Sequence, residues 1–351
     1  MAVEMDRLEQ LMGKVLDELG ATLGIGLVSV GERAGLWEGL AGAGPLTSQE
    51  LAERTGCNER YVREWLRAMA AAGWLDYDAE ADAYSADEET GFAMAAPDGP
   101  SVPGACELAL AVLRSAPEVA QRFRTGEGFG WHEHHHDLFT GTERFFRPQY
   151  ATHLVDEWIP ALDGVEEKLR AGARVADVGC GHGASTILMA QAFPASRFTG
   201  FDYHGPSIEH ARRAAEEAGV ADRVEFAQAP ADGFPGEGWD LVAFFDCLHD
   251  MGDPVAVARH VRAALAPDGT WMIVEPRAGD AVAENLNPVG RLFYAASTLV
   301  CTPASLAQDG RAALGAQAGE RTLVEVLRAG GFTRVRRATD TPVNMVLEAR
   351  P

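Results

Sequence analysis

The sequence has few basic residues and few cysteines for its length. Its 351 residues include 30 Lys and Arg residues against 52 Asp and Glu residues, and the formal net charge is −22. Such a negative field repels phosphate backbones and anionic lipid headgroups, so it argues against nucleic acid and membrane surfaces as partners. The five cysteines are scattered, odd in number and without a CxxC pair. That usage favours free thiols in a reducing cytoplasm over a disulfide framework.

Two kinds of targeting segment are also missing. No run reaches the roughly 18 consecutive apolar residues that a membrane-spanning helix needs. The N-terminal segment MAVEMDRLEQ carries acidic residues where a signal peptide carries Lys or Arg. Because 47% of the residues are hydrophobic and the length suits about two domains, the sequence predicts a globular, cytoplasmic protein.

The first third of the chain has a helical pattern. Apolar residues recur at intervals of three and four, which predicts one apolar stripe on a helix. The stripe consists of Leu8, Leu11, Met12, Val15, Leu16 and Leu19. The nearly all-apolar segment 21–30 predicts a helix buried in a core or against a second subunit. We therefore expect residues 5–30 to mediate homodimerisation.

The pattern of a winged helix follows within a mainly α-helical domain of residues 1–96. Thr47 and Glu50 have the spacing of a capping box, and Asn58 is placed to cap a second helix that Gly73 ends. Segments 74–78 and 83–85 predict a short hairpin.

DNA binding is the rival use of this winged helix, because Arg60, Arg63 and Arg67 fall on its second helix. Residues 1–100, however, hold 7 Lys and Arg residues against 19 Asp and Glu residues. Since DNA affinity depends on neutralising phosphates, the charge favours dimerisation over DNA binding.

Residues 97–164 predict a helical linker that contributes to a substrate cavity. The segment 132–136 formally matches the HExxH pattern of zinc proteases, but Gly126, Gly128 and Gly130 precede it and weaken a helix. We therefore predict no catalytic metal there. A polar loop lining the cavity, and a non-catalytic metal bound by His132, His134, His135 or His136, remain as alternatives.

Residues 165–351 predict an α/β domain, because strand and helix patterns alternate as in a parallel sheet. A closing antiparallel hairpin is predicted from Phe332–Ala338 and Val343–Glu348. The segment Asn285–Leu314 predicts a helical insertion that covers the substrate or packs the domain.

A glycine-rich loop and an acidic residue carry the main chemical signal. The loop Asp177-Val-Gly179-Cys-Gly181-His-Gly183 follows a strand pattern and opens a helix, and Asp202 ends the next strand, where a carboxylate can bind ribose hydroxyls. A dinucleotide site usually reads GxGxxG, whereas this loop reads GxGxG. Asp177 would repel a pyrophosphate and attract the amino group of a cationic amino-acid cofactor, which indicates S-adenosylmethionine.

These motifs resemble those of the class I S-adenosylmethionine-dependent methyltransferases over about Val165–Arg350. The resemblance implies a Rossmann-like, seven-stranded domain with a reversed last hairpin, with S-adenosylmethionine as cofactor and S-adenosylhomocysteine as product. It also implies that adenine meets the end of the third strand, where Ala231 and Asp232 stand. The expected cofactor-binding residues are Asp177, Gly179, Cys180, Gly181, Gly183, Asp202, Tyr203, Ala231, Asp232, Phe245 and Asp246.

The whole chain is similar to bacterial methyltransferases and transcriptional regulators with an N-terminal winged helix, on the segments 46–52, 131–134 and 246–250. The tripeptide Leu248-His-Asp250 also resembles the segment with the catalytic histidine of plant-type small-molecule O-methyltransferases, in which a winged helix mediates dimerisation. That pattern usually continues with Trp, where this chain has Met251.

His249 is the best candidate for a general base. It follows the fourth strand pattern of the α/β domain, at the sheet edge that faces the ligand crevice. An unperturbed histidine has a pKa near 6.5, so it can accept a hydroxyl proton at neutral pH. By analogy with the plant-type enzymes, Asp250 or Glu275 orients the imidazole.

The sequence thus predicts a homodimeric methyltransferase that methylates an oxygen of a small, aromatic or apolar molecule. Asp246 is a candidate contact for this acceptor as well as for the cofactor. The other expected substrate contacts are Trp131, His132, Phe146, Tyr150 and Tyr294. Two alternatives stay open: a ligand-sensing transcriptional regulator with the methyltransferase fold, and a metal-assisted C-methyltransferase that uses His249 with another histidine.

Overall fold

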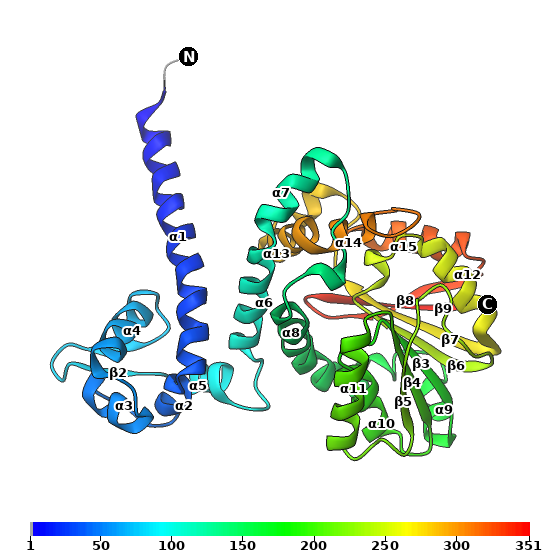
Figure 1. The fold of residues 1–351 in the computed structure, drawn as a ribbon, viewed down its shortest axis with the longest axis horizontal. Coiled ribbons are helices and arrows are strands. Elements are labelled where there is room, and N and C mark those ends of the chain that lie inside the picture. Colours follow the sequence, from blue (N-terminus) through cyan, green and yellow to red (C-terminus); the bar gives the residue numbers. More distant parts are fainter. Residues whose placement is uncertain (1–2) are drawn as a thin grey trace. The chain divides into compact units, whose positions relative to one another are not determined.

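The structure is a computed structural model that describes residues 3–351. The chain divides into two compact units, an N-terminal unit that ends at Leu110 and a C-terminal unit that begins at Ala111. Figure 1 shows the elements of each unit coloured along the chain. Within residues 3–351, no helix is both long enough and apolar enough to cross a membrane.

The N-terminal unit is mainly helical and carries a short hairpin. Its elements are α1 (Met5–Arg33), α2 (Leu36–Leu40), α3 (Ser48–Thr55), α4 (Glu59–Ala71), β1 (Asp76–Asp78), β2 (Ala83–Ser85), α5 (Glu88–Ala95) and the first part of α6 (Val102–Arg114). The stripe and the apolar segment after it form one continuous helix, α1, because Gly20, Gly24 and Gly26 are accommodated within it. The side chains of the stripe are exposed.

The caps of α3 and α4 form as their spacing predicts. The Thr47 hydroxyl accepts a hydrogen bond from the Glu50 backbone, and the Glu50 carboxylate accepts one from the Thr47 backbone at 2.8 Å. The Asn58 side chain accepts from the Arg60 backbone at 3.1 Å. These helices pack with α1, α2 and α5 around a small core, in which the rings of Trp37 and Trp65 meet edge to face with centroids 4.8 Å apart.

The C-terminal unit begins with helices that precede its sheet. These are α7 (Ala116–Thr125), the 3₁₀ turn η1 (Trp131–Glu133), α8 (Asp137–His153), the π-helical turn η2 (Leu154–Trp158) and α9 (Val165–Ala171). The HExxH match is not helical: His132 lies in η1 and His136 caps α8. Its two histidines therefore do not occupy one helix face, as a zinc protease requires.

A seven-stranded sheet in the order β5-β4-β3-β6-β7-β9-β8 forms the centre of this unit. Its strands are β3 (Arg174–Val178), β4 (Arg197–Asp202), β5 (Val224–Gln228), β6 (Trp239–Phe245), β7 (Leu265–Pro276), β8 (Arg334–Asp340) and β9 (Asn344–Arg350). β9 runs antiparallel to both β7 and β8, and the other pairs are parallel. The predicted Rossmann-like sheet with a reversed last hairpin is confirmed.

Helices cover both faces of the sheet (Figure 1). They are α10 (Ala184–Ala192), α11 (Gly205–Glu217), α12 (Pro254–Ala264) and α15 (Gly319–Ala329). Alternate residues of β3 serve different cores: Val175 packs with α9, α10 and α11, whereas Ala176 and Val178 pack with α12 and α15. Burial on both faces is typical of a central strand in a parallel sheet and explains why most residues of β3 are apolar.

The predicted helical insertion lies between β7 and α15. It consists of η4 (Val282–Asn285), α13 (Pro288–Ala296), the π-helical turn η5 (Ser297–Cys301) and α14 (Thr302–Leu306). β3 and β6 are neighbours in the sheet, but the chain continues from β3 toward one edge of the sheet and from β6 toward the other. Ligands of open α/β sheets bind at such a topological switch point. The glycine loop follows β3 and the segment around His249 follows β6, so both meet there.

Candidate functional site

The glycine-rich loop after β3 adopts a backbone that requires glycine. Gly179, Gly181 and Gly183 have φ angles of 75°, 52° and 84°, in the left-handed region that other residues avoid. A Cβ atom on Gly179 would also lie 2.7 Å from the Sγ atom of Cys247. The loop therefore packs tightly against the segment that follows β6.

Asp202 joins this loop at the end of β4. Its Oδ2 atom accepts a hydrogen bond from the Gly181 backbone at 2.9 Å, and its Oδ1 atom accepts one from the His204 backbone at 2.8 Å. Burial raises the pKa of Asp202, although these two bonds oppose the shift. The structure thus brings together the loop and the acid that the sequence singles out.

Asp177 is buried beneath the loop with one oxygen atom unused. Its Oδ2 atom accepts hydrogen bonds of 2.6 Å from the hydroxyls of Ser185 and Thr186, whereas Oδ1 has no hydrogen-bond partner within residues 3–351. Burial raises the pKa of Asp177 to about 6 despite the two hydroxyls. An unpaired buried carboxylate oxygen is costly, and a cationic group would relieve that cost.

The segment after β6 places a third acid, the partly buried Asp246, beside the loop. Asp246 has a φ of 51°, which is strained for a residue with a side chain. Its carboxylate accepts hydrogen bonds from the Asn344 amide at 2.7 Å and from the Tyr150 hydroxyl at 3.2 Å. Burial, reinforced by the charge of Glu275, raises the pKa of Asp246 to about 8. Phe245 is buried, with its ring 5.1 Å from that of Tyr150.

His249 lies between two carboxylates in the 3₁₀ turn η3 (Leu248–Asp250). Its Nδ1 atom is 2.5 Å from Oε2 of Glu275, and its Nε2 atom is 3.2 Å from Oδ1 of Asp250. The other oxygen of Glu275 accepts a hydrogen bond from the Leu248 backbone at 2.8 Å, which fixes the carboxylate. The geometry therefore selects Glu275 as the partner of Nδ1 and places Asp250 at Nε2.

The charges around His249 favour its protonated form. Burial acts to lower the pKa of His249, but the carboxylates of Glu275 and Asp250 outweigh it, and the pKa lies well above the usual value for histidine. Burial also raises the pKa of Asp250, against the charge of His249.

The buried acids fit a cationic cofactor. Asp177, Asp202 and Asp246 all have pKa values raised mainly by burial, so the protein holds these carboxylates in a costly state. A ligand with an ammonium and a sulfonium group would supply the opposite charge that they lack. S-adenosylmethionine carries both groups, and the residues present suit it.

Two pairs of expected site residues contact each other through their rings. Tyr203 is partly exposed, and its ring meets that of His132 edge to face at 6.0 Å. Phe146 stacks on Tyr150 with centroids 5.9 Å apart, which places it near Asp246.

Four other expected residues, one of them within the glycine-rich loop, have contacts of their own. Trp131 packs against Phe139, with centroids 5.4 Å apart. Ala231 packs on the core beneath α12, and Asp232 is exposed after β5. Cys180 is buried, and burial raises the pKa of its thiol well above the usual value.

Several contacting residues were not found from the sequence. Asn344 reaches Asp246 from the closing hairpin, and Cys301 of η5 lies with His249 and Asp250, their donor atoms within 4.8 Å of one another. Neither has a local motif. Ser185 and Thr186, by contrast, follow the glycine loop at the start of α10, where the strand–turn–helix geometry points back at Asp177.

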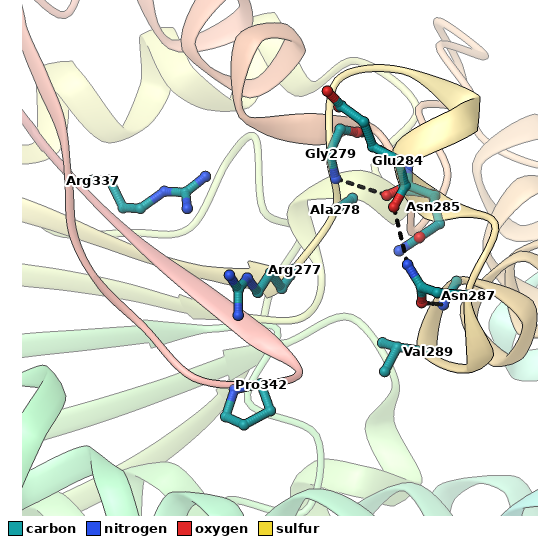
Figure 2. Close-up of a pocket in the computed structure, with 11 residues that line it drawn as sticks. Arg277, Ala278, Gly279, Glu284, Asn285, Asn287, Val289, Arg337 and Pro342 are labelled. Atoms are coloured by element: carbon teal, nitrogen blue, oxygen red, sulfur yellow. Dashed lines mark hydrogen bonds between the residues drawn. The ribbon is translucent and has the colours of Figure 1, made fainter.

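A separate polar cleft of about 460 Å³ lies between the end of β7, the closing hairpin and the insertion. Figure 2 shows Arg277 and Arg337 on one side of it and Asn285 and Asn287 on the other. The Asn285 amide exchanges hydrogen bonds with the Gly279 backbone and lies 3.5 Å from the hydroxyl of Tyr294. Tyr294 is therefore linked to this cleft through Asn285 but does not line it.

Family models match both halves of the chain. The model of the Rv2258c-like winged HTH domain matches residues 21–95, and that of a methyltransferase domain matches residues 169–320.

Two curated proteins are similar in sequence. The 27-O-demethylrifamycin SV methyltransferase of Amycolatopsis mediterranei is 32% identical over 188 residues, which cover 51% of this chain and 67% of that protein. The mitomycin biosynthesis 6-O-methyltransferase of Streptomyces lavendulae is 27% identical over 246 residues, which cover 66% of this chain and 68% of that protein.

Solved structures share the fold along the whole chain. The mitomycin 7-O-methyltransferase superposes with a TM-score of 0.74 at 21% identity, covering 99% of this chain and 100% of that one. Human N-acetylserotonin methyltransferase in complex with S-adenosylmethionine superposes with a TM-score of 0.68 at 17% identity, covering 100% of this chain and 99% of that one.

Proposed function

Because the chain belongs to the S-adenosylmethionine-dependent methyltransferases with an N-terminal winged-helix domain, we propose that it methylates an oxygen atom of a small molecule. The acceptor has an aromatic or apolar body, consistent with the rings of Phe146 and Tyr150 beside Asp246. Support for oxygen comes from the relative whose name specifies 6-O-methylation in mitomycin biosynthesis.

The cofactor's binding in this proposal depends on the acids around the glycine loop. Asp202 accepts the ribose hydroxyls on the lone pairs that Gly181 and His204 leave free. Asp177 accepts the ammonium group on its unpaired Oδ1 atom. When bound, S-adenosylmethionine supplies an activated methyl group on a positively charged sulfur atom.

The observation that carries the base is the hydrogen bond between His249 and Glu275. With Nδ1 held by Glu275, Nε2 is the nitrogen that receives the acceptor's proton, while Asp250 stabilises the imidazolium that forms. A base must be neutral to act, and positive charge in the neighbouring cofactor site lowers the pKa of His249 toward that form. Glu275 is a positioning residue in this scheme.

Dimerisation through α1 belongs to the same proposal. The stripe on α1 leaves apolar side chains in solvent within its own unit; Leu19 is 57% and Leu23 72% exposed. A row of exposed apolar residues at helical spacing is typical of a protein interface. A second copy of α1 is the occupant that the periodicity favours.

The regulator alternative has less support from the winged helix. Arg60 and Arg63 of α4 form ion pairs with Glu64 and Glu59 at 2.6 and 2.7 Å, so much of the helix's positive charge is neutralised locally. DNA affinity requires that charge for phosphates. We therefore assign the winged helix to assembly rather than to DNA.

The metal-assisted alternative needs a second histidine beside His249. Within residues 3–351, the group of metal-type donors that contains His249 is completed by Asp250 and Cys301 instead. Carbon methylation with two histidines has no support from this arrangement.

The direct test offers the enzyme a deuterated-methyl cofactor and a panel of phenols, hydroquinones, amines and activated carbon acids. Mass spectrometry of the products locates the label. Label on oxygen in wild type, formed at least about 100-fold more slowly by His249→Ala, is the expected outcome. Label on carbon or nitrogen alone would refute the proposal.

A further inference from the structure

A group of metal-type donors lies beside the glycine loop, apart from the residues assigned to base catalysis. It consists of Glu143 of α8, His182 of the loop and His210 of α11. His182 stands between Gly181 and Gly183, so it belongs to the backbone that would face the cofactor. The three side chains come from three different elements, which indicates that folding brings them together.

The distances approach those of a bound ion. The donor atoms all lie within 4.8 Å of one another. Oε2 of Glu143 is 2.8 Å from Nδ1 of His182 and 3.6 Å from Nε2 of His210. Two ligands of a tetrahedral zinc ion, bound at about 2.0–2.1 Å, are separated by about 3.3 Å. The observed distances bracket that value, so small side-chain rotations would complete the site.

The two imidazoles lie face to face beside the carboxylate. The rings of His182 and His210 are nearly parallel, with centroids 3.9 Å apart and an angle of 18° between their planes. A nitrogen atom of each ring therefore lies within 4 Å of the same Glu143 oxygen atom, Oε2. Imidazole nitrogen and carboxylate oxygen are both ligand types that zinc accepts.

Exposure leaves room for a fourth ligand. The His182 side chain is 9% exposed and that of Glu143 22%, whereas that of His210 is 42% exposed at the surface of α11. Water can therefore reach the ion on the His210 side. Two histidines, one carboxylate and a water form a ligand set that suits Zn²⁺ and related divalent ions.

We propose that Glu143, His182 and His210 bind one divalent transition-metal ion of the Zn²⁺ type, which fixes the glycine loop to α8 and α11. This site is independent of the proposed acceptor chemistry, because it requires neither S-adenosylmethionine nor His249.

The other two donor groups in the described part of the chain are weaker candidates. The group His135, His136 and Asp137 comes from consecutive residues, and the guanidinium of Arg114 already pairs with Asp137 at 2.9 Å. That positive charge opposes a cation. The group of His249, Asp250 and Cys301 belongs to the site already described.

The test uses the full-length, tag-free protein after treatment with a chelator. Cobalt(II) chloride is titrated while the visible absorption of tetrahedral Co²⁺ is recorded, and zinc chloride is then added as a competitor. We expect one equivalent to bind and Zn²⁺ to displace it. His210→Ala should weaken Co²⁺ binding by about 100-fold or more, because a ligand is lost. Zinc should raise the melting temperature of wild type but not of His210→Ala.

The matched control is His136→Ala, which removes an exposed histidine from the competing group. It should bind Co²⁺ as wild type does. Glu143→Gln preserves the size of the carboxylate side chain and should lower the affinity at least about tenfold. The proposal is overturned if wild type gives no tetrahedral Co²⁺ spectrum, if His210→Ala binds as tightly as wild type, or if binding is lost in His136→Ala instead.

Discussion

At the scale of single residues, the two ring nitrogens of His249 have different neighbours. Nδ1 lies 2.5 Å from the carboxylate of Glu275, which also accepts a hydrogen bond from the Leu248 backbone. Nε2 lies 3.2 Å from Oδ1 of Asp250, and that oxygen atom has no hydrogen-bond partner within residues 3–351. An imidazole held in this way presents one nitrogen for proton transfer. The sequence left the roles of Asp250 and Glu275 open, and these distances support our proposal that Glu275 orients the imidazole.

Replacing the base should separate binding from turnover. His249→Ala is expected to leave the Kd for S-adenosylmethionine within about twofold and to lower kcat by about 10²–10⁴-fold, the usual contribution of a general base. Calorimetry measures the first quantity, and product formation the second. His153→Ala, which removes a histidine of α8 outside this site, should leave both quantities unchanged. A kcat of His249→Ala within threefold of wild type would contradict the assignment.

The partner of the base should control the pH dependence. The charge of Glu275 helps to raise the pKa of His249, so Glu275→Gln should lower that pKa. A base acts when deprotonated, and activity therefore rises with pH through this pKa. The acidic limb of kcat/KM should move to lower pH in the variant, together with a smaller maximum from poorer orientation. An acidic limb that stays in place would exclude His249 as the titrating group.

Residues with a local motif could be predicted, and those brought in by tertiary contacts could not. Gly179, Gly181 and Asp202 follow strand ends, and the strand–loop–helix pattern places such residues in one crevice. Asn344 contacts Asp246 across 98 residues of chain. Its position depends on β9 pairing with β7, which no spacing in the sequence encodes.

At the scale of elements, the correct predictions depend on interactions between residues that are close in the sequence. The capping box of α3 is fixed by residues three apart, so its spacing sufficed to predict it. The stripe and the apolar segment 21–30, which the sequence indicates as separate helical patterns, form one helix, α1. The segment 131–136 forms a 3₁₀ turn and a helix cap, as the preceding glycines indicate.

The stripe on α1 predicts a specific effect on assembly. Leu19→Glu places a charge on an exposed residue of this apolar stripe and should convert a dimer to a monomer, as measured by light scattering after size exclusion. The control Gln10→Glu adds the same charge to an exposed residue on the opposite face of α1. A monomeric wild type would contradict dimerisation through this stripe. So would a Leu19→Glu variant that stays dimeric while Gln10→Glu becomes monomeric.

At the scale of the whole molecule, the acidic composition has a counterpart at the site. The chain carries a formal net charge of −22, and the crevice at the switch point of the sheet buries several carboxylates. The domain boundaries at residues 96 and 164 stay predictions, because the structure divides the chain only at Leu110.

Cofactor binding should release protons. Burial raises the pKa of Asp177 to about 6 and that of Asp246 to about 8, so the free protein retains a proton on Asp246 near neutral pH and on Asp177 in mildly acidic solution. A cation favours their ionised forms, and affinity for S-adenosylmethionine should therefore increase from about pH 5.5 to about pH 7.5. Calorimetry in buffers of different ionisation enthalpy measures the release. Asp246→Asn should release fewer protons; an affinity that falls with pH in this range would contradict the account.

The most direct test of the whole account is the calorimetric titration of S-adenosylmethionine into wild type and Asp202→Ala, because it needs no knowledge of the acceptor. Wild type should bind one equivalent per chain. Asp202→Ala should raise the Kd by about tenfold to hundredfold, the effect of losing hydrogen bonds to a charged group. Asp222→Ala, which removes an exposed acid paired with Arg223, should bind as wild type does. A wild type that does not bind, or an Asp202→Ala variant with unchanged Kd, would contradict the account.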